Sequence, residues 1–215
     1  IIDGNRNGSV VKSTSPTTNC GIYGLTIQNG SGDPELYYYG LMLSYGGGFH
    51  IQNSQLYTIT NCSVTRNSAY IGGGIYNSSG NILIAGTQVI NNFALGGGGI
   101  MLQTYGQMIF DPINRCSVYN NTAAIIQDIW GAGTRLDTNI ILDKATVYPH
   151  TSFYIYCNEA IPIYYGSFPV IDILQGHRTE INHDFFVSPQ GNDNNDGLSA
   201  AYPLKSIHKA MQLIA

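Results

Sequence analysis

The sequence predicts an all-β protein that folds as a right-handed parallel β-helix, a solenoid whose short strands stack from one rung of the coil to the next. The first observation is a glycine-led motif. It occurs as GGGF, GGGI and GGGGI and ends at Phe49, Ile75 and Ile100, so its copies lie 26 and then 25 residues apart. A repeat of about 20 to 50 residues is typical of proteins built from stacked rungs.

The second observation is an Asn-rich turn that recurs at nearly the same interval as the glycine motif. Each copy runs from a valine to an Asn three residues later, and the copies are Val64–Asn67, Val89–Asn92 and Val118–Asn121. The third is the alternation of side chains over short stretches such as 57–60, which is typical of strands. Gly and Asn suit the corners between strands because they tolerate left-handed backbone conformations.

A single rung of this size cannot bury its apolar side chains by itself, so the repeats are expected to be stable only when stacked. Stacked rungs pair in parallel at about 4.8 Å. The usual chirality of parallel crossover connections favours a right-handed coil.

Three regions follow one another along the chain. Residues 1–133 carry the repeats and are interpreted as C-terminal rungs of one parallel β-helix, with an insertion at 32–40 that widens one rung as a loop. Residues 134–183 are strand-like but aperiodic, and we interpret them as a terminal cap or a linker module. Residues 184–215 predict a strand, a tight turn and a helix capped by Ser206.

The composition excludes some functions. Charged residues make up only 10% of the chain, and the net charge of −4 gives no basic surface for nucleic acid. No apolar run is long enough to span a membrane, and we do not expect the first residues to form a leader. We expect the chain to be a piece of a longer polypeptide with flanking domains.

The cysteines do not predict an obvious disulfide framework. Cys62 and Cys116 each lie two residues before the valine of a turn, and Thr87 holds the same position between them. They are therefore expected two rungs apart, at about 9.6 Å, which is beyond the limit of about 7 Å for a bridge. We expect both to be small buried side chains.

The repeats resemble those of bacterial secreted β-helix proteins, in particular the GGA(I/L/V) and FxxN repeats of the polymorphic outer-membrane proteins of chlamydiae. The glycine motifs, together with Asn67, Asn92 and Asn121, carry the resemblance. Gly replaces the Ala of that family, and valine stands where it often has Phe. The resemblance implies a secreted or cell-surface location in a bacterium and no particular receptor.

The segment 185–199, with Pro203, Lys205 and Ile207, carries a second resemblance. It is similar to the segment that opens many secreted pectate-lyase-like β-helix proteins, where it forms a first strand, a turn and a helix over the N-terminal end of the coil. The resemblance implies that a second β-helix domain begins at about residue 184.

Catalytic residues are not identified in the sequence. Cleavage of sugar chains needs a pair of carboxylates or a basic residue supported by carboxylates. Between Gly46 and Asn121 the only acid is Asp111. Asp33 and Glu35 lie in the insertion and are interpreted as solvated loop charges, and His50 is interpreted as isolated.

Aromatic residues of the insertion are candidates for ligand binding. Tyr37, Tyr38 and Tyr39, together with Tyr45, either form a platform for sugar rings or a protein partner, or fold back over the flank of the coil.

Two arginines are further candidates. Arg66 and Arg115 are expected at nearly equivalent corners two rungs apart. There they either clamp an anionic sugar or lie along the surface of the coil.

A candidate cation site lies near the C-terminus. Asn192, Asn194 and Asp196, followed by Gly197, resemble the first half of a calcium loop, in which alternate side-chain oxygens converge on Ca²⁺. The twelfth position is Pro203 and supplies no bidentate Glu. The same residues are also typical of an Asx-stabilised turn before a helix.

Three functions remain open from the sequence. The first is an extracellular or cell-surface β-helix that binds polysaccharide or other surface ligands, as an adhesin or scaffold. The second is a fragment of a polysaccharide lyase or glycoside hydrolase whose catalytic rungs lie outside this chain. The third is a structural spacer between surface domains.

Overall fold

The computed structural model describes residues 1–15, 19–36, 40–103, 106–132, 139–148, 155–157, 170–179 and 184–214 of the 215-residue chain. The chain divides into two compact units, Ile1–Arg178 and Thr179–Ala215.

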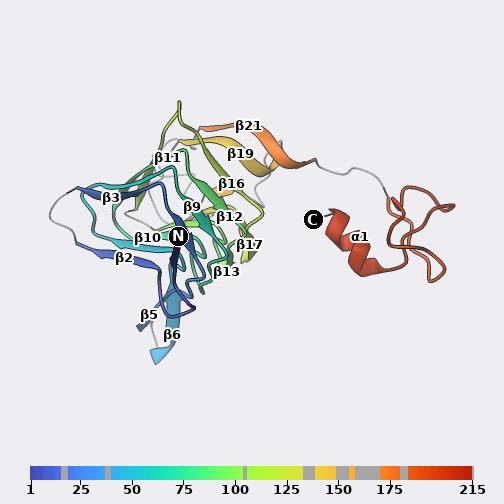
Figure 1. Cartoon of the computed structure of the whole chain (residues 1–215), viewed down its shortest axis with the longest axis horizontal. Helices are drawn as coiled ribbons and strands as arrows, with labels where there is room; N and C mark the ends of the chain where they lie inside the picture. The colour runs from blue at the N-terminus through green and yellow to red at the C-terminus, as the bar shows by residue number, and fades with distance from the viewer. Residues whose placement is uncertain are drawn as a thin grey trace, which may run out of the picture. The chain divides into compact units, whose positions relative to one another are not determined.

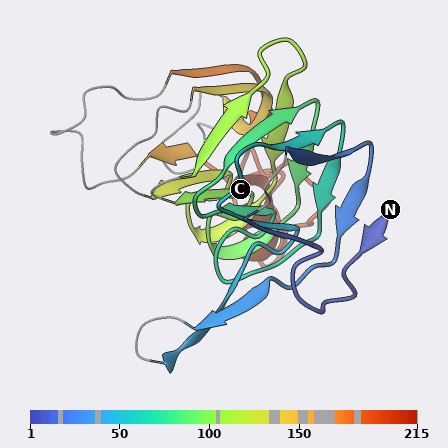
Figure 2. The ribbon, with the colours of Figure 1, turned by 90° about the vertical axis from the view of Figure 1, so that its left-hand side faces the viewer.

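The first unit is a parallel β-solenoid of about five turns, which confirms the predicted all-β stacked architecture (Figure 1). Figure 2 shows the chain winding through successive rungs. The handedness stays a prediction.

Three sheets run along the coil. The six-stranded sheet contains β2 (Val11–Thr14), β7 (Phe49–Gln52), β10 (Ile75–Asn77), β14 (Ile100–Gln103), β18 (Ile129–Ala132) and β20 (Ile155–Cys157). The seven-stranded sheet contains β1 (Ile2–Asp3), β4 (Thr26–Gln28), β9 (Ser63–Thr65), β12 (Gln88–Ile90), β16 (Cys116–Tyr119), β19 (Ile140–Tyr148) and β21 (Ile171–Thr179). The four-stranded sheet contains β15 (Gln107–Phe110), β11 (Asn81–Ala85), β8 (Tyr57–Thr60) and β3 (Cys20–Tyr23).

Two shorter sheets complete the unit. Strands β13 (Phe93–Gly96) and β17 (Thr122–Ile125) pair in parallel at one corner of the coil. Strands β5 (Asp33–Leu36) and β6 (Met42–Tyr45) pair in antiparallel fashion. The insertion that was predicted to be a loop is therefore a β-hairpin, which projects from the coil in Figures 1 and 2.

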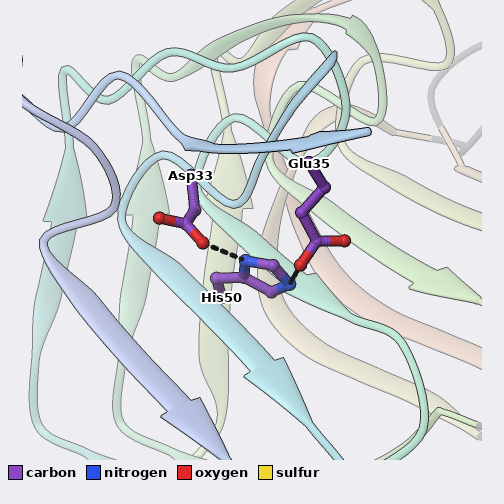
Figure 3. Close-up of side chains that lie close together, drawn as sticks. All are labelled: Asp33, Glu35 and His50. Atoms are coloured by element: carbon purple, nitrogen blue, oxygen red, sulfur yellow. Dashed lines mark ion pairs between the residues drawn. The ribbon is translucent and has the colours of Figure 1, made fainter. Parts of the chain in front are cut away.

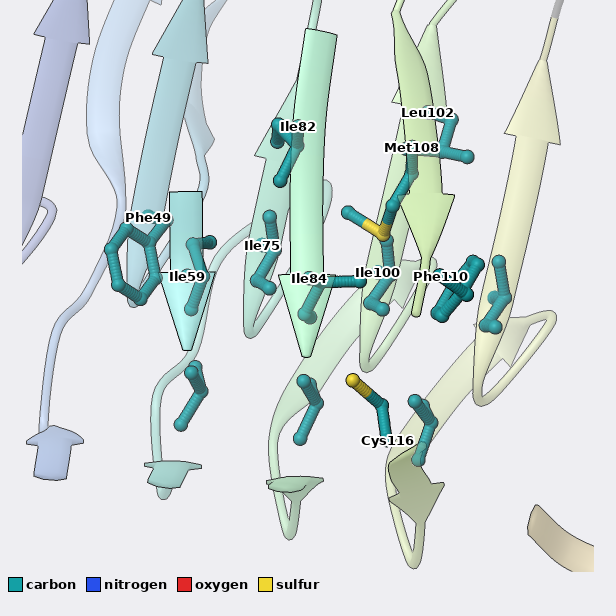
Figure 4. Close-up of a cluster of buried hydrophobic side chains, with 14 of the residues drawn as sticks. Phe49, Ile59, Ile75, Ile82, Ile84, Ile100, Leu102, Met108, Phe110 and Cys116 are labelled. Carbon is teal, nitrogen blue, oxygen red and sulfur yellow. The ribbon is translucent and has the colours of Figure 1, made fainter. Parts of the chain in front are cut away.

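The core of the coil is built from side chains at equivalent positions on successive rungs. Ile75 pairs with Phe49 on one side and with Ile100 on the other, and all three are fully buried. Figure 4 shows these side chains on successive rungs inside the apolar cluster. The predicted column is confirmed, and it places the glycine motifs directly over one another.

Buried asparagines hold the turns of successive rungs together. Asn67 donates from Nδ2 to Oδ1 of Asn92 at 3.1 Å, and Asn92 donates in the same way to Asn121 at 3.1 Å. Asn121 donates to Oδ1 of Asp128 at 3.1 Å, which ends the ladder. These bonds satisfy amide groups that would otherwise be buried without partners, and they explain why the turn motif ends in Asn.

The glycine motif has a steric cause. A Cβ placed on Gly74 would lie 2.5 Å from the carbonyl oxygen of Gly99 on the next rung. The equivalent distance from Gly48 to the oxygen of Gly74 is 2.6 Å. Only glycine lets the rungs approach this closely at these positions.

Strands of the 134–183 region join the sheets of the coil. Strand β19 pairs in parallel with β16, and β20 pairs in parallel with β18. The described strands of this region therefore continue the stacking, although the glycine motifs have ended.

The buried cysteines agree with the sequence analysis. Cys62 and Cys116 are free and buried, and the hydroxyl of Thr87 accepts a hydrogen bond from the backbone N–H of Cys62 at 3.2 Å. Burial raises the pKa of the Cys116 thiol to about 12.

The second unit contains turns and one helix. Val187 and Leu204 form a parallel bridge, and α1 spans Ile207–Ile214. The hydroxyl of Ser206 accepts a hydrogen bond from the backbone N–H of Lys209 at 3.1 Å, as expected of a helix cap. In the described part of the chain, no helix combines the length and apolar character needed to cross a membrane.

Candidate functional site

The candidate site lies where the hairpin meets the outer face of the six-stranded sheet. Asp33 and Glu35 are alternate residues of β5, so their side chains lie on the same face of the hairpin. Pairing of Asp33 with Tyr45 and of Glu35 with Leu43 fixes that face. Both carboxylates point at His50 (Figure 3).

His50 faces outward from the coil because its neighbours in β7, Phe49 and Ile51, face the core. Its side chain is nevertheless 0% exposed. Nδ1 of His50 lies 3.7 Å from Oδ2 of Asp33, and Nε2 lies 3.5 Å from Oε1 of Glu35. The ring therefore lies between the two carboxylates, as Figure 3 shows.

Aromatic rings complete the enclosure of His50. The ring of Tyr76 meets it edge-on with centroids 5.2 Å apart, and the ring of Tyr45 lies at 6.3 Å. Tyr45 and Tyr76 belong to a small apolar cluster outside the main core, with Leu43 and Met101. Burial raises the pKa of Tyr76 well above its usual value, so its hydroxyl remains a hydrogen-bond donor.

Lys12 supplies the positive charge of the site. It pairs with His50 in the register of β2 and β7, and its ammonium group contacts the carboxylate of Asp33. Burial lowers the pKa of His50, the negative charge of Glu35 opposes this effect, and Lys12 adds to it. Within the described part of the chain, neither ring nitrogen of His50 has a hydrogen-bond partner.

Two further contacts connect the site to the open face of the sheet. Gln52 donates from Nε2 to Oε1 of Glu35 at 2.9 Å. The hydroxyl of Tyr76 donates to Oε1 of Gln103. Thr14 pairs with Gln52 in the register of β2 and β7. Ser78 and Gln103 directly follow Asn77 and Leu102, which are paired with each other in the same sheet. These uncharged hydrogen-bonding side chains are here called the polar row, which consists of Thr14, Gln52, Ser78 and Gln103.

Asp33, Glu35 and His50 were not expected to meet, but the structure brings them together. Asp33 and Glu35 are not solvated loop charges, because their side chains are only 23% and 35% exposed and contact His50. His50 is not isolated. Alternation in Asp33-x-Glu35 was a signal that both side chains share one face of a strand, but only the folded hairpin shows which histidine they meet.

The predicted tyrosine platform is described only in part. Tyr37, Tyr38 and Tyr39 lie outside the described residues. Tyr45 is 6% exposed and packs against Tyr76. It therefore forms a wall of the site and does not offer an exposed ring face for stacking.

The prediction that the two arginines lie at nearly equivalent corners is wrong. Arg66 follows the last residue of β9, whereas Arg115 precedes the first residue of β16, so they lie at opposite ends of their strands. Arg66 donates to Oε1 of Gln28 at 3.1 Å. Arg115 pairs with Oδ2 of Asp172 at 2.6 Å, so its charge is already compensated.

The predicted calcium residues form a turn. Oδ1 of Asn192 accepts a hydrogen bond from the backbone N–H of Asn194 at 3.0 Å, and Oδ1 of Asp196 accepts one from Leu198 at 3.0 Å. Both are Asx turns, as the second interpretation of this segment expected. Calcium binding there stays a prediction.

A comparison of this chain with known protein families, with curated proteins and with solved structures finds no match in any of the three.

Proposed function

We propose that this chain is a binding scaffold that presents one face of its solenoid to a polysaccharide or a similar ligand rich in hydroxyl groups. The proposal places it outside a bacterial cell or on its surface, as an adhesin or scaffold. The observation that carries it is the polar row beside the hairpin site.

The polar row suits uncharged hydroxyl groups. Amide and hydroxyl side chains donate and accept hydrogen bonds, and a regular sheet repeats them at about 4.8 Å from one rung to the next. The side chains of the row are exposed or half-buried. Trp130, on the neighbouring line of outward positions, is half-buried and offers an apolar ring surface next to them.

The low charge of the coil supports a neutral ligand more than an anionic one. Arg66 and Arg115 are engaged with Gln28 and Asp172, and Lys12 contacts Asp33. Each of these three cations therefore has a partner within the chain. A strongly anionic polymer would have to displace these partners.

The hairpin site itself favours binding over hydrolysis. A glycosidase places the scissile bond between its two carboxylates. Here the imidazole of His50 lies between Asp33 and Glu35, with contacts of 3.7 and 3.5 Å. A sugar ring would need the space that His50 fills.

Affinity electrophoresis of the chain through gels that contain soluble neutral polysaccharides tests the proposal. The chain is expected to be retarded by at least one polysaccharide. Gln103→Ala is expected to reduce the retardation several-fold because it removes an amide from the polar row.

A matched control is Gln107→Ala. Gln107 is exposed on β15 and belongs to the four-stranded sheet, not to the sheet that carries the polar row. The proposal is wrong if no polysaccharide in a broad panel retards the chain, which would favour a structural spacer, or if Gln107→Ala weakens binding as much as Gln103→Ala. Release of unsaturated or reducing sugars by the chain would instead favour an enzyme.

A further inference from the structure

We propose that Asp33, Glu35 and His50 form a binding site for one divalent transition-metal ion that accepts mixed nitrogen and oxygen ligands, such as Zn²⁺. The proposal does not depend on polysaccharide binding. It rests on the convergence of the three side chains and on the state of His50.

The three residues are close enough to share an ion. Each offers one ligand atom, and these atoms lie within 4.8 Å of one another. Ligand atoms around a tetrahedral ion with bonds of about 2.1 Å lie about 3.4 Å apart. A single ion binds only one ring nitrogen of His50. Nε2 lies 3.5 Å from Glu35 and Nδ1 lies 3.7 Å from Asp33, so whichever nitrogen binds has one carboxylate already near that separation. The carboxylate side chains are partly exposed, so they can rotate to close the longest gap.

The state of His50 is the second, independent observation. Its side chain is 0% exposed, and neither Nδ1 nor Nε2 has a hydrogen-bond partner among the residues that the structure describes. Buried polar atoms without partners are rare in proteins. An ion bound to one ring nitrogen satisfies that nitrogen and fixes the N–H on the other.

The ligand set selects the class of ion. Calcium and magnesium prefer oxygen ligands, whereas imidazole suits zinc and other late divalent metals. With neutral His50, the two carboxylates and Lys12 leave one net negative charge at the site. That charge favours a cation, and the protein supplies three ligands, which leaves one position of a tetrahedral ion open to water or to a hydroxyl of a ligand.

Lys12 competes with the metal ion for Asp33. Its ammonium group contacts the Asp33 carboxylate, and its side chain is 45% exposed. It can therefore move into solvent when an ion binds. The Lys12→Gln variant is expected to bind metal at least as tightly as the unmodified chain. If Lys12 instead held the carboxylates in place through an ordinary structural ion pair, the variant would lose metal binding.

Titration of the full chain, free of any affinity tag and kept reduced, tests the proposal with Zn²⁺ by calorimetry and with Co²⁺ by visible absorption. One ion per chain is expected. The Co²⁺ spectrum is expected to show weak bands of nitrogen and oxygen ligation and no intense thiolate band.

His50→Gln is expected to weaken binding at least tenfold. The matched control is His177→Gln, because His177 is exposed on β21 and lies outside the site. If circular dichroism shows that His50→Gln does not fold, Asp33→Asn and Glu35→Gln replace it. Each removes a ligand on the hairpin and is expected to weaken binding at least tenfold.

Three outcomes would overturn the proposal. The first is that Zn²⁺ binds no more tightly than about 0.1 mM. The second is that His177→Gln weakens binding as much as the site variants do. The third is that Lys12→Gln abolishes binding.

Discussion

Asp128 occupies the last position of the asparagine ladder. Its carboxylate accepts the hydrogen bond that an Asn side chain accepts on the earlier rungs. Its Oδ1 accepts from Asn121, and its Oδ2 accepts from the backbone N–H of Thr146, both at 3.1 Å. Burial raises the pKa of Asp128 from its ordinary value of 3.8 to about 6, and the hydrogen bonds only partly oppose that shift. The ladder therefore ends on a group that titrates within an accessible pH range.

This gives a prediction for the stability of the coil as a function of pH. Between about pH 4 and pH 6 the folded chain holds the Asp128 proton more tightly than the unfolded chain does. The Asp128 contribution is therefore fully present below the unfolded pKa and is lost as the pH rises through about 6. A shift of about two units corresponds to roughly 3 kcal/mol in the free energy of unfolding.

Thermal melts of the chain and of Asp128→Asn at pH 4.5 and pH 7 measure this effect. Carboxyl groups with lowered pKa values, such as that of Asp172 beside Arg115, change stability with pH in the opposite direction. Both proteins contain these groups, so their contributions cancel when the stability of one protein is subtracted from that of the other. The chain is expected to lose more stability than the variant between the two pH values. Parallel pH dependences would contradict the pKa shift of Asp128.

At the scale of the element, the glycine motif determines how closely two rungs approach. The Cβ of an alanine at position 74 would lie 2.5 Å from the carbonyl oxygen of Gly99, a backbone atom that cannot rotate away. The repeats that this motif resembles have Ala after two glycines. In this coil the third position must be Gly, because a larger side chain would clash with the next rung.

We predict that Gly74→Ala destabilises the coil by several kcal/mol, since it must separate two rungs. Gly24→Ala is the control. Gly24 has a positive φ of 69°, and a Cβ there meets nothing within 4 Å, so this change costs only backbone strain of about 1 to 2 kcal/mol. Urea denaturation compares the two variants, and equal destabilisation would show that spacing between rungs is not the cause.

The repeated elements were predictable because each one carries its own signal. Phe49, Ile75 and Ile100 fall in one column, and the Asn of each turn falls in another. The site was not predictable in the same way. It depends on the hairpin folding back over β7, and nothing in the repeat indicates which residue of the coil the insertion meets.

The arginine prediction failed for a related reason. Spacing along the sequence placed Arg66 and Arg115 at nearly equivalent corners two rungs apart. They do lie two rungs apart, but the third rung is longer and shifts Arg115 to the other end of its strand. Arg66 falls instead in register with Asn91 and Asn120, and all three have φ of 55°. Small insertions of this kind change the corner on which a residue lies without changing the repeat.

At the scale of the whole molecule, the first unit is a one-dimensional stack. Each rung contacts its neighbours on either side, so stability is expected to vary along the coil. Strands β9 and β12 have partners on both sides, whereas β1 and β2 lie at the edges of their sheets.

We therefore predict that amide hydrogen exchange is slowest in β9, β12 and their neighbours on the same rungs, and at least tenfold faster in β1 and β2. Exchange monitored by mass spectrometry on peptides from each rung measures the gradient. Uniform protection from β1 to β12 would mean that the coil opens as one cooperative unit.

One consequence follows from the position of the hairpin. Lys12 and His50 are neighbours across β2 and β7, and the carboxylates come from the stretch of chain that joins those two strands. All four side chains thus belong to a single circuit of the polypeptide. The glycine motif at 46–48 lies within this circuit, between the carboxylates and His50. Recombination between solenoids at that motif would therefore part the acids of the hairpin from the histidine, and the cluster is inherited whole only when both exchange points fall outside residues 12–50.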